Sequence, residues 1–203
     1  LIRTLPTSAA GLHNPWAQTC PHETPENGTQ QRIERLARHL DCDPMAILVG
    51  EATGYQGCRY SGVAFTSERL LIEGAIPRIA PLSHRLSRRA RPFSEPSATI
   101  VWRTLYELGV AERTILWNAV QLHPHKPNEP WSNRTPTTDE LAYGAEALQI
   151  LRQAYPNALV IAVGNKARDA LNEQGIIPHA CVRHPANGGA TLFADGLKNA
   201  LNG

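Results

Sequence analysis

Four short runs of apolar, largely β-branched residues stand out along the chain and predict buried strands. They are Ala46 to Val49, Ile115 to Asn118, Leu159 to Val163 and Ala180 to Val182. An unbroken apolar run, in place of an alternating one, is typical of a strand that is covered on both faces, as in a parallel sheet.

Amphipathic segments lie between and around these runs and predict helices. They are Gln30 to Leu40, Ala98 to Leu108, Thr138 to Ala154, Asn165 to Gln174 and Thr191 to Leu201. In the first of them the apolar side chains share one face, namely Ile33, Leu36, Ala37 and Leu40. The third starts with the residues TTDE, in which a threonine is expected to cap the helix.

Strands that alternate with helices predict an α/β fold. We expect a three-layer α/β/α sandwich with a short central parallel sheet of four strands. Residues 1–203 are expected to form a single domain, with residues 1–29 as an N-terminal extension. Ligands of such folds bind at the carboxyl ends of the strands. The segments at that rim are Gly50-Glu51, Asn118 to His123, Gly164-Asn165 and Arg183 to Pro185.

Composition narrows the class of protein without naming a function. With 42% hydrophobic and 19% charged residues, the chain has the make-up of an ordinary globular protein. A formal net charge of +2 is compatible with nucleic-acid binding but does not argue for it. No apolar run reaches membrane-spanning length, and the opening residues LIRTLPTSAAGLHNPW lack the apolar core of a signal peptide. The four cysteines form no CxxC pair. We therefore expect a cytoplasmic protein with reduced thiols that acts as a monomer away from membranes.

Four segments, read together, resemble the uracil-DNA glycosylase superfamily. GEATG (Gly50 to Gly54) is similar to the first motif of that superfamily, in the GEAPG form of its iron–sulfur branch. SGVAFTSE (Ser61 to Glu68) resembles the segment that carries the base-stacking aromatic residue. WNAVQLHPHKP and NRTPTTDE (within Trp117 to Glu140) resemble the strand-end Asn segment and the NRTP turn of the branch. HPANGG (His184 to Gly189) resembles the His-Pro motif, and the order and spacing of all these segments agree.

The resemblance implies a monofunctional DNA glycosylase, which flips a base out of DNA and hydrolyses its N-glycosidic bond to leave an abasic site. It implies that Phe65 stacks on the base, that Asn118 reads its edge, and that His184 stabilises the negative charge of the departing base. The first motif and its neighbour would complete the base pocket through Gly50, Ala52, Gly54 and Tyr55. Because an amide can be turned either way, Asn118 alone does not distinguish uracil from a cytosine-like edge.

The water that attacks the sugar needs a residue to orient it, and here the chain departs from the superfamily. Members use an Asp, an Asn or neither at the third position of the first motif, which is Ala52 in this chain. Glu51 is the nearest carboxylate and is the candidate for holding the water. Alternatively, Glu51 caps the following turn or fixes Tyr55.

Further departures bear on cofactors and on the substrate. Leu122 stands where the iron–sulfur branch has a cysteine, and the N-terminal CxxC of that branch is missing, so we predict no cluster and no other cofactor. His123 and His125 suggest a metal site, but no carboxylate or cysteine follows at a usual spacing, so we predict none. Gly54 replaces the Tyr that blocks C5 substituents in the best-known uracil enzymes, which leaves that side open unless Tyr55 closes it.

Contacts to DNA are expected from cationic and polar side chains. HRLSRRAR (His84 to Arg91), followed by a helix start at Ser97, predicts a loop that tracks phosphates, and the alternative is a solvated surface loop. The predicted contacts are Arg85, Arg88, Arg89, Arg91, Ser97, Arg183 and Asn187. The superfamily fills the gap left by the flipped base with a bulky side chain after the His-Pro pair, but ANGGAT contains none. Either Asn187 or another loop takes that place, or the substrate is partly single-stranded.

Three functions therefore stay open at the level of sequence. The first is excision of uracil or a related pyrimidine in DNA repair. The second is excision of a C5-modified, phage-type cytosine in anti-phage defence, which Gly54 would permit. The third is a non-catalytic DNA-binding module on a glycosylase scaffold, suggested by Ala52 and the missing wedge.

Overall fold

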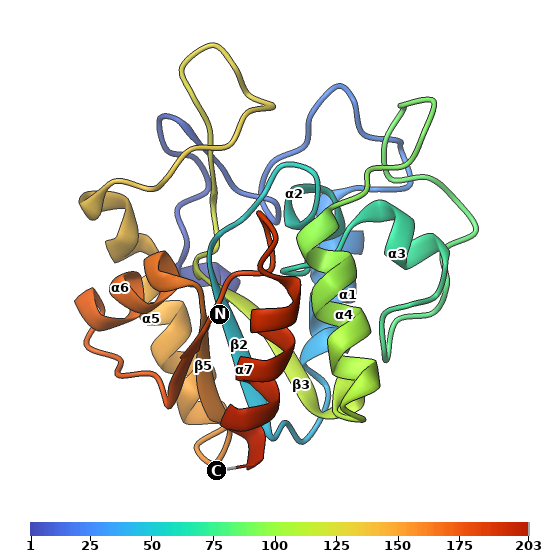
Figure 1. The fold of residues 1–203 in the computed structure, drawn as a ribbon. Helices are drawn as coiled ribbons and strands as arrows, with labels where there is room; N and C mark the ends of the chain where they lie inside the picture. The colour runs from blue at the N-terminus through green and yellow to red at the C-terminus, as the bar shows by residue number, and fades with distance from the viewer. Residues whose placement is uncertain (203) are drawn as a thin grey trace.

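The structure, a computed structural model, describes residues 1–202 and is built around a four-stranded parallel sheet (Figure 1). Its strands are β2 (Ala46–Ala52), β3 (Thr114–Val120), β5 (Leu159–Val163) and β6 (Ala180–Val182), in the spatial order β3-β2-β5-β6. All four predicted strands are present, and the last two have the predicted bounds. The first two extend further than the apolar runs, because β2 and β3 stay paired through Gly50↔Asn118 and Ala52↔Val120.

Helices cover both faces of this sheet, as predicted for a three-layer α/β/α sandwich. One core contains residues of α4 (Pro96–Glu107) and α7 (Ala190–Asn202), and the other contains residues of α1 (Thr29–Leu40), α5 (Thr138–Ala154) and α6 (Asn165–Glu173). Successive strand residues enter opposite cores, since Leu48 lies in the first and Val49 in the second. Within residues 1–202, none of the helices combines the length and the apolar character that crossing a membrane requires.

The shorter elements were not apparent in the sequence pattern. They are the 3-10 helices η1 (Ile2–Thr4) and η2 (Ala111–Arg113), the strands β1 (Leu12–His13) and β4 (His123–Pro124), and the helices α2 (Cys58–Ser61) and α3 (Glu68–Ile72). Strands β1 and β4 pair antiparallel, and Trp16 of the N-terminal segment is buried in the second core. The predicted N-terminal extension therefore packs onto the rest of the chain. The N-terminal segment and the segments before α4 and α5 gather at one end of the molecule (Figure 1).

Helix boundaries follow local chemistry. Helix α5 has the predicted bounds because Thr137 and Glu140 form a complete capping box. Helix α4 begins at Pro96 and not at Ser97, since proline is well suited to the first turn of a helix, and Glu95 makes no side-chain capping bond there.

Helix α1 buries the predicted face only in part, since Leu36 is buried and Ile33 and Leu40 pack against the second core. Ala37 is exposed, whereas Arg32, Arg35 and His39 are buried. The guanidinium group of Arg32 donates hydrogen bonds to three backbone carbonyl groups and pairs with Glu23 Oε2 at 3.0 Å. Buried charge is tolerated when it is paired and hydrogen-bonded, so hydrophobic periodicity alone did not identify these buried polar residues.

Candidate active site

A cavity of about 530 Å³ opens at the carboxyl ends of the parallel strands. It lies where the topology of an open parallel sheet predicts a ligand site. Many of the predicted site residues line it: Gly50, Glu51, Ala52, Gly54, Phe65, Ser97, Asn118, Arg183, His184 and Asn187. The predicted residues that do not line it are Tyr55, Arg85, Arg88, Arg89 and Arg91.

Gly50 is the point where two of the lining side chains converge. A Cβ atom added to Gly50 would lie 2.8 Å from both Asn118 Oδ1 and Phe65 Cζ. The register pairs Gly50 with Asn118, so both residues face the same side of the sheet. The glycine therefore makes room for the aromatic ring and the amide at the floor of the cavity.

The amide of Asn118 is oriented by a short chain of hydrogen bonds. Thr53 Oγ1 has one hydrogen to donate, and its acceptors are the backbone carbonyl oxygen of Gln121 at 2.7 Å and the more distant Cys58 Sγ at 3.5 Å. The same oxygen therefore accepts a hydrogen bond from Asn118 Nδ2, at 3.4 Å. This arrangement leaves Asn118 Oδ1 without a partner among residues 1–202, at the surface of the cavity.

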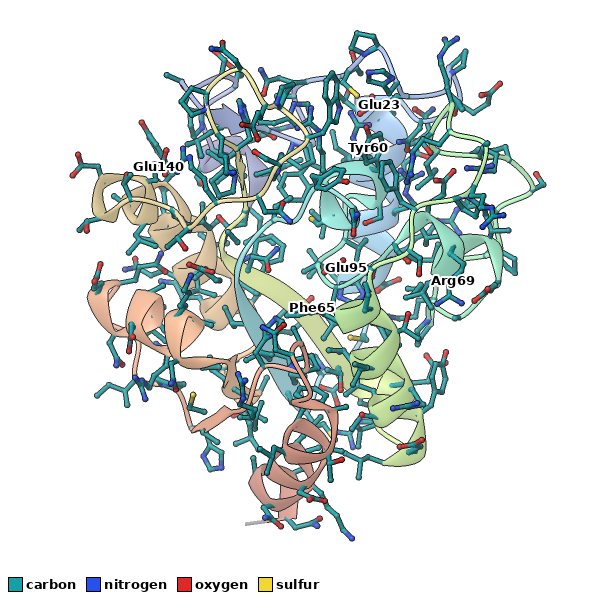
Figure 2. All side chains as sticks on the ribbon, turned by 45° about the horizontal axis from the view of Figure 1, so that its top comes forward. Glu23, Tyr60, Phe65, Arg69, Glu95 and Glu140 are labelled. Carbon is teal, nitrogen blue, oxygen red and sulfur yellow. The ribbon has the colours of Figure 1, made fainter. Side chains whose placement is uncertain are left out.

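Phe65 is held in an unusual backbone conformation. Its φ of 48° lies in the left-handed region, which costs a non-glycine residue on the order of 1–3 kcal/mol. The surrounding structure fixes it, because Trp102 Nε1 donates to the carbonyl oxygen of Phe65 at 2.9 Å. The ring is almost fully buried and lies near that of His184, with 6.4 Å between the ring centroids. Phe65 and Glu95 both lie at the end of the sheet where α4 begins (Figure 2).

His184 presents a hydrogen-bond donor. Its Nδ1 accepts the backbone N–H of Ala186 at 3.1 Å, so a neutral ring carries its hydrogen on Nε2. Burial, with a smaller contribution from the adjacent Arg183, lowers the pKa of His184, which favours this neutral form.

Glu51 is a partly buried carboxyl group at the edge of the cavity. Burial raises its pKa, and the Lys166 ammonium group, 3.9 Å from Glu51 Oε1, partly opposes that shift. A carboxylate with a raised pKa is a better proton acceptor near neutral pH. Glu51 bonds neither the following turn nor Tyr55, whose backbone N–H donates instead to Asn133 Oδ1 at 3.0 Å.

Glu95 is a cavity residue that the sequence analysis missed. It stands just before α4 and lines the cavity, and burial raises the pKa of its carboxyl group to about 7. In the sequence it appears only as the acidic residue of the stretch PFSEPS. Its proximity to Gly57, which brings it into the site, is a tertiary contact that no local pattern signals.

Tyr55 is turned away from the open side next to Gly54. Its ring packs edge-on against Phe93, with 5.6 Å between centroids, and tilts against His123 at 6.4 Å. In this conformation Tyr55 does not close the cavity.

The basic loop is anchored by a buried carboxylate. Glu68, whose side chain is fully buried, accepts hydrogen bonds from Arg85 Nε at 2.7 Å and from the backbone N–H groups of Leu86, Ser87 and Phe93. This loop is therefore ordered from within, and Arg85 spends part of its hydrogen-bonding capacity inside the protein.

The other loop arginines are exposed. Arg88 Nε donates to the carbonyl oxygen of Glu23 at 2.8 Å, and the guanidinium group of Arg89 lies 4.2 Å from the centroid of the Phe93 ring. Arg91 makes no ion pair or hydrogen bond through its side chain within the described part of the chain. None of these three arginine side chains lines the cavity.

Potential metal ligands do not cluster. Across residues 1–202, no group of three or more His, Cys, Asp or Glu side chains is arranged to hold a metal ion, and all four cysteines are free. His123 is buried, and its ring faces Arg59 Nη1 at 2.9 Å and the carbonyl oxygen of Ser132 at 2.9 Å.

Comparison with known proteins places the chain in a family. A family model described as the uracil DNA glycosylase superfamily matches residues 38–194. No curated protein matches the chain. Among solved structures, the crystal structure of wild-type SMUG2 from Pedobacter heparinus matches with a TM-score of 0.59 and 16% sequence identity, covering 98% of this chain and 90% of that chain. At 16% sequence identity the match to the solved structure supports the fold alone. The match to the family model is the finding that bears on the activity.

Proposed function

The chain belongs to the uracil DNA glycosylase superfamily and is a DNA glycosylase, and on that basis we propose that it excises a flipped-out uracil or related pyrimidine by hydrolysis alone. The observation that carries this proposal is the orientation of Asn118, fixed by Thr53, beside the buried ring of Phe65. A flat base fits against that ring. The edge of the base then faces the Asn118 amide, in which the contact with Thr53 fixes the positions of the oxygen and the nitrogen.

The direction of the amide favours a uracil-type edge. Uracil offers a donor at N3 and an acceptor at O4, which match Asn118 Oδ1 and the second N–H of Nδ2. Cytosine offers the opposite pattern, so the amide would have to flip. A flipped Asn118 would turn Oδ1 toward Thr53 Oγ1, whose hydrogen is already given to Gln121, and two acceptors would face each other.

We propose that two ionisable groups of the cavity, His184 and Glu51, carry out bond cleavage. When the C1′–N1 bond breaks, its electron pair leaves with the base, and the N–H of His184 Nε2 stabilises the charge on O2. Glu51 accepts a proton from the attacking water, whose oxygen bonds to C1′, and the carboxylate also stabilises positive charge on the sugar. The products are a free base and an abasic site.

A C5-modified pyrimidine is the second candidate substrate. No side chain projects from Gly54, and the nearest atom to a Cβ built there is 3.9 Å away. That space supports a role in defence against phages with modified DNA, although the Asn118 orientation favours a modified uracil over a modified cytosine.

We propose that DNA binds across the mouth of the cavity. Ser97, Arg183 and Asn187 line the cavity, and we propose that the exposed Arg88, Arg89 and Arg91 extend the DNA-binding surface with positive charge. We also propose that the protein acts as a monomer, and the free cysteines favour a cytoplasmic setting.

Abasic-site formation on end-labelled oligonucleotides with one uracil tests the proposal. Wild-type protein should generate abasic sites, and Asn118→Ala should abolish them. Thr53→Val, which removes the orienting hydroxyl group, should lower the preference for uracil over cytosine about tenfold, whereas Thr53→Ser should retain it. Failure of the wild-type protein on uracil and on every C5-modified pyrimidine would contradict the proposed function.

A further inference from the structure

The carboxyl group of Glu95 has no partner within the described chain. It lines the cavity, it makes no side-chain capping bond to α4, and burial is the one cause of its shifted pKa. The Glu95 side chain is only partly buried, so its carboxyl group is open to the cavity and within reach of a ligand there. Such groups are candidates for contacts with a ligand.

Two glycines leave the space that this carboxyl group fills. A Cβ atom at Gly57 would overlap Glu95 Oε2 and would lie 3.0 Å from Glu95 Cδ. A Cβ atom at Gly54 would lie 3.9 Å from Glu95 Oε1. Any larger residue at position 57 would therefore displace the Glu95 carboxyl group. Next to Gly54, in contrast, the cavity stays open beside that carboxyl group.

The order of the strands decides which edge of a bound base faces Glu95. His184 follows β6 at one end of the sheet, and Asn118 lies in β3 at the other end. In the proposed orientation, O2 of the base faces His184, and the edge that carries N3 and O4 faces Asn118. C5 is bonded to C4 and lies across the ring from C2, so its substituent points away from His184. Asn118 bonds Thr53, Gly54 follows Thr53 in the chain, and Glu95 Oε1 lies 3.9 Å from a Cβ atom built at Gly54, so the cavity wall continues from Asn118 to Glu95.

We propose that Glu95 recognises the C5 substituent of the base, and that the preferred substrate is a uracil-type base whose C5 substituent carries a hydrogen-bond donor, such as a hydroxymethyl or aminomethyl group. The inference rests on the proposed function, because it uses the orientation of the base given there. A donor at this position supplies the partner that the carboxyl group lacks. A methyl group leaves the carboxyl group unpaired and more deeply desolvated, and a carboxyl substituent repels it.

The test compares excision of five bases in otherwise identical oligonucleotides. They are uracil, thymine, 5-hydroxymethyluracil, 5-aminomethyluracil and 5-carboxyuracil. For wild-type protein we expect kcat/KM to be about tenfold higher for the hydroxymethyl and aminomethyl bases than for thymine, which is the upper end of what one hydrogen bond allows. The carboxyl base should be the poorest substrate.

Variants of Glu95 separate recognition from folding. Glu95→Ala should reduce the preference for hydroxymethyluracil over thymine by about tenfold, and should reduce excision of the hydroxymethyl base more than excision of uracil. Glu95→Gln keeps the size and an acceptor oxygen, so it should retain the hydroxymethyl preference and lose the aminomethyl preference. Glu107→Ala, at the far end of α4, is the matched control and should change neither ratio.

The outcomes distinguish this inference from the function on which it rests. Wild-type protein that excises uracil but shows no preference for donor-bearing substituents would overturn the inference and leave the proposed function intact. An equal reduction on all five bases in both Glu95 variants, with unchanged thermal unfolding, would also overturn it. Inactivity of the wild-type protein on every base would overturn both.

Discussion

Asn118 Oδ1 occupies space that a side chain at Gly50 would need, since a Cβ atom there would lie 2.8 Å away from it. The two residues pair across β2 and β3, so their separation is set by the sheet. The direction of the amide and the absence of a side chain at Gly50 are therefore parts of the same arrangement.

We expect Gly50→Ala to reduce kcat/KM on the preferred base by about 100-fold, because displacing a substrate-positioning group by about 1 Å can cost that much. The methyl group would push aside both Asn118 and the ring of Phe65. Gly196→Ala, whose Cβ would meet Val182 at an ordinary contact distance of 3.4 Å, is the control and should remain active. Near-normal excision by Gly50→Ala would show that this convergence does not matter for catalysis.

Glu51→Gln should lower kcat by about 100-fold or more, within the range typical of general-base catalysis, and should leave DNA affinity unchanged. Because the pKa of Glu51 is raised, wild-type activity should decline as pH falls through that raised value, and the variant should lack this acid limb. Single-turnover rates across a pH series, with binding measured by anisotropy, check both expectations. Glu146→Gln, on the exposed face of α5, is the control, and a variant as fast as wild type would rule out Glu51 as the base.

His39 predicts a pH dependence of stability. It is fully buried, its Nε2 accepts the backbone N–H of Leu116 at 2.9 Å, and burial lowers its pKa from 6.5 to about 3. Between those values the unfolded chain binds a proton that the folded chain does not. The free energy of unfolding should therefore fall with decreasing pH, by about 1.4 kcal/mol per pH unit for this residue.

Urea unfolding at a series of pH values measures this slope. His39→Gln keeps an acceptor for the Leu116 amide and does not titrate, so its slope should be smaller. The slope should not vanish, because the buried His123 also has a pKa lowered to about 3, by burial first and Arg59 second. Equal slopes for wild type and variant would contradict the prediction.

Arg91 should contribute to DNA affinity by neutralising a phosphate group. Its side chain is exposed, and Arg91→Ala should weaken binding equally for all DNA sequences. The slope of log K against log salt concentration should become shallower by about 0.9, the value for one phosphate group that is no longer neutralised. Arg103→Ala, an exposed arginine of α4 that pairs with Glu107 at 3.7 Å, should leave the slope unchanged. Identical salt dependence for both variants would place the DNA elsewhere.

The sheet was predictable because its strands are covered on both faces. A buried strand such as β5 must be apolar throughout, so its residues Leu159–Val163 are recognisable without knowledge of its neighbours. The residues that follow each strand could also be placed, because the carboxyl ends of parallel strands lie at the same edge of the sheet. This is why Glu51, Asn118 and His184 could be placed around one cavity before any geometry was known.

Tertiary contacts set the limits of that approach. The burial of Arg32 depends on carbonyl groups from distant loops, and the position of Glu95 depends on Gly57. Likewise, the hydrogen-bond relay from Gln121 through Thr53 joins residues 68 positions apart in sequence. None of these partners can be identified from periodicity, which reports burial against a core but not pairing between polar groups.

The anchoring of the basic loop by Glu68 has a consequence for how the protein meets DNA. Because Ser87 Oγ and three backbone N–H groups are bound to this carboxylate, the loop between Arg85 and Phe93 already has its shape in the free protein. The conformational entropy of ordering it is lost during folding and not during association. The rate at which the protein associates with DNA should therefore be set by diffusion and charge, and not by ordering of the loop. The loop presents the same surface to every DNA site that it contacts.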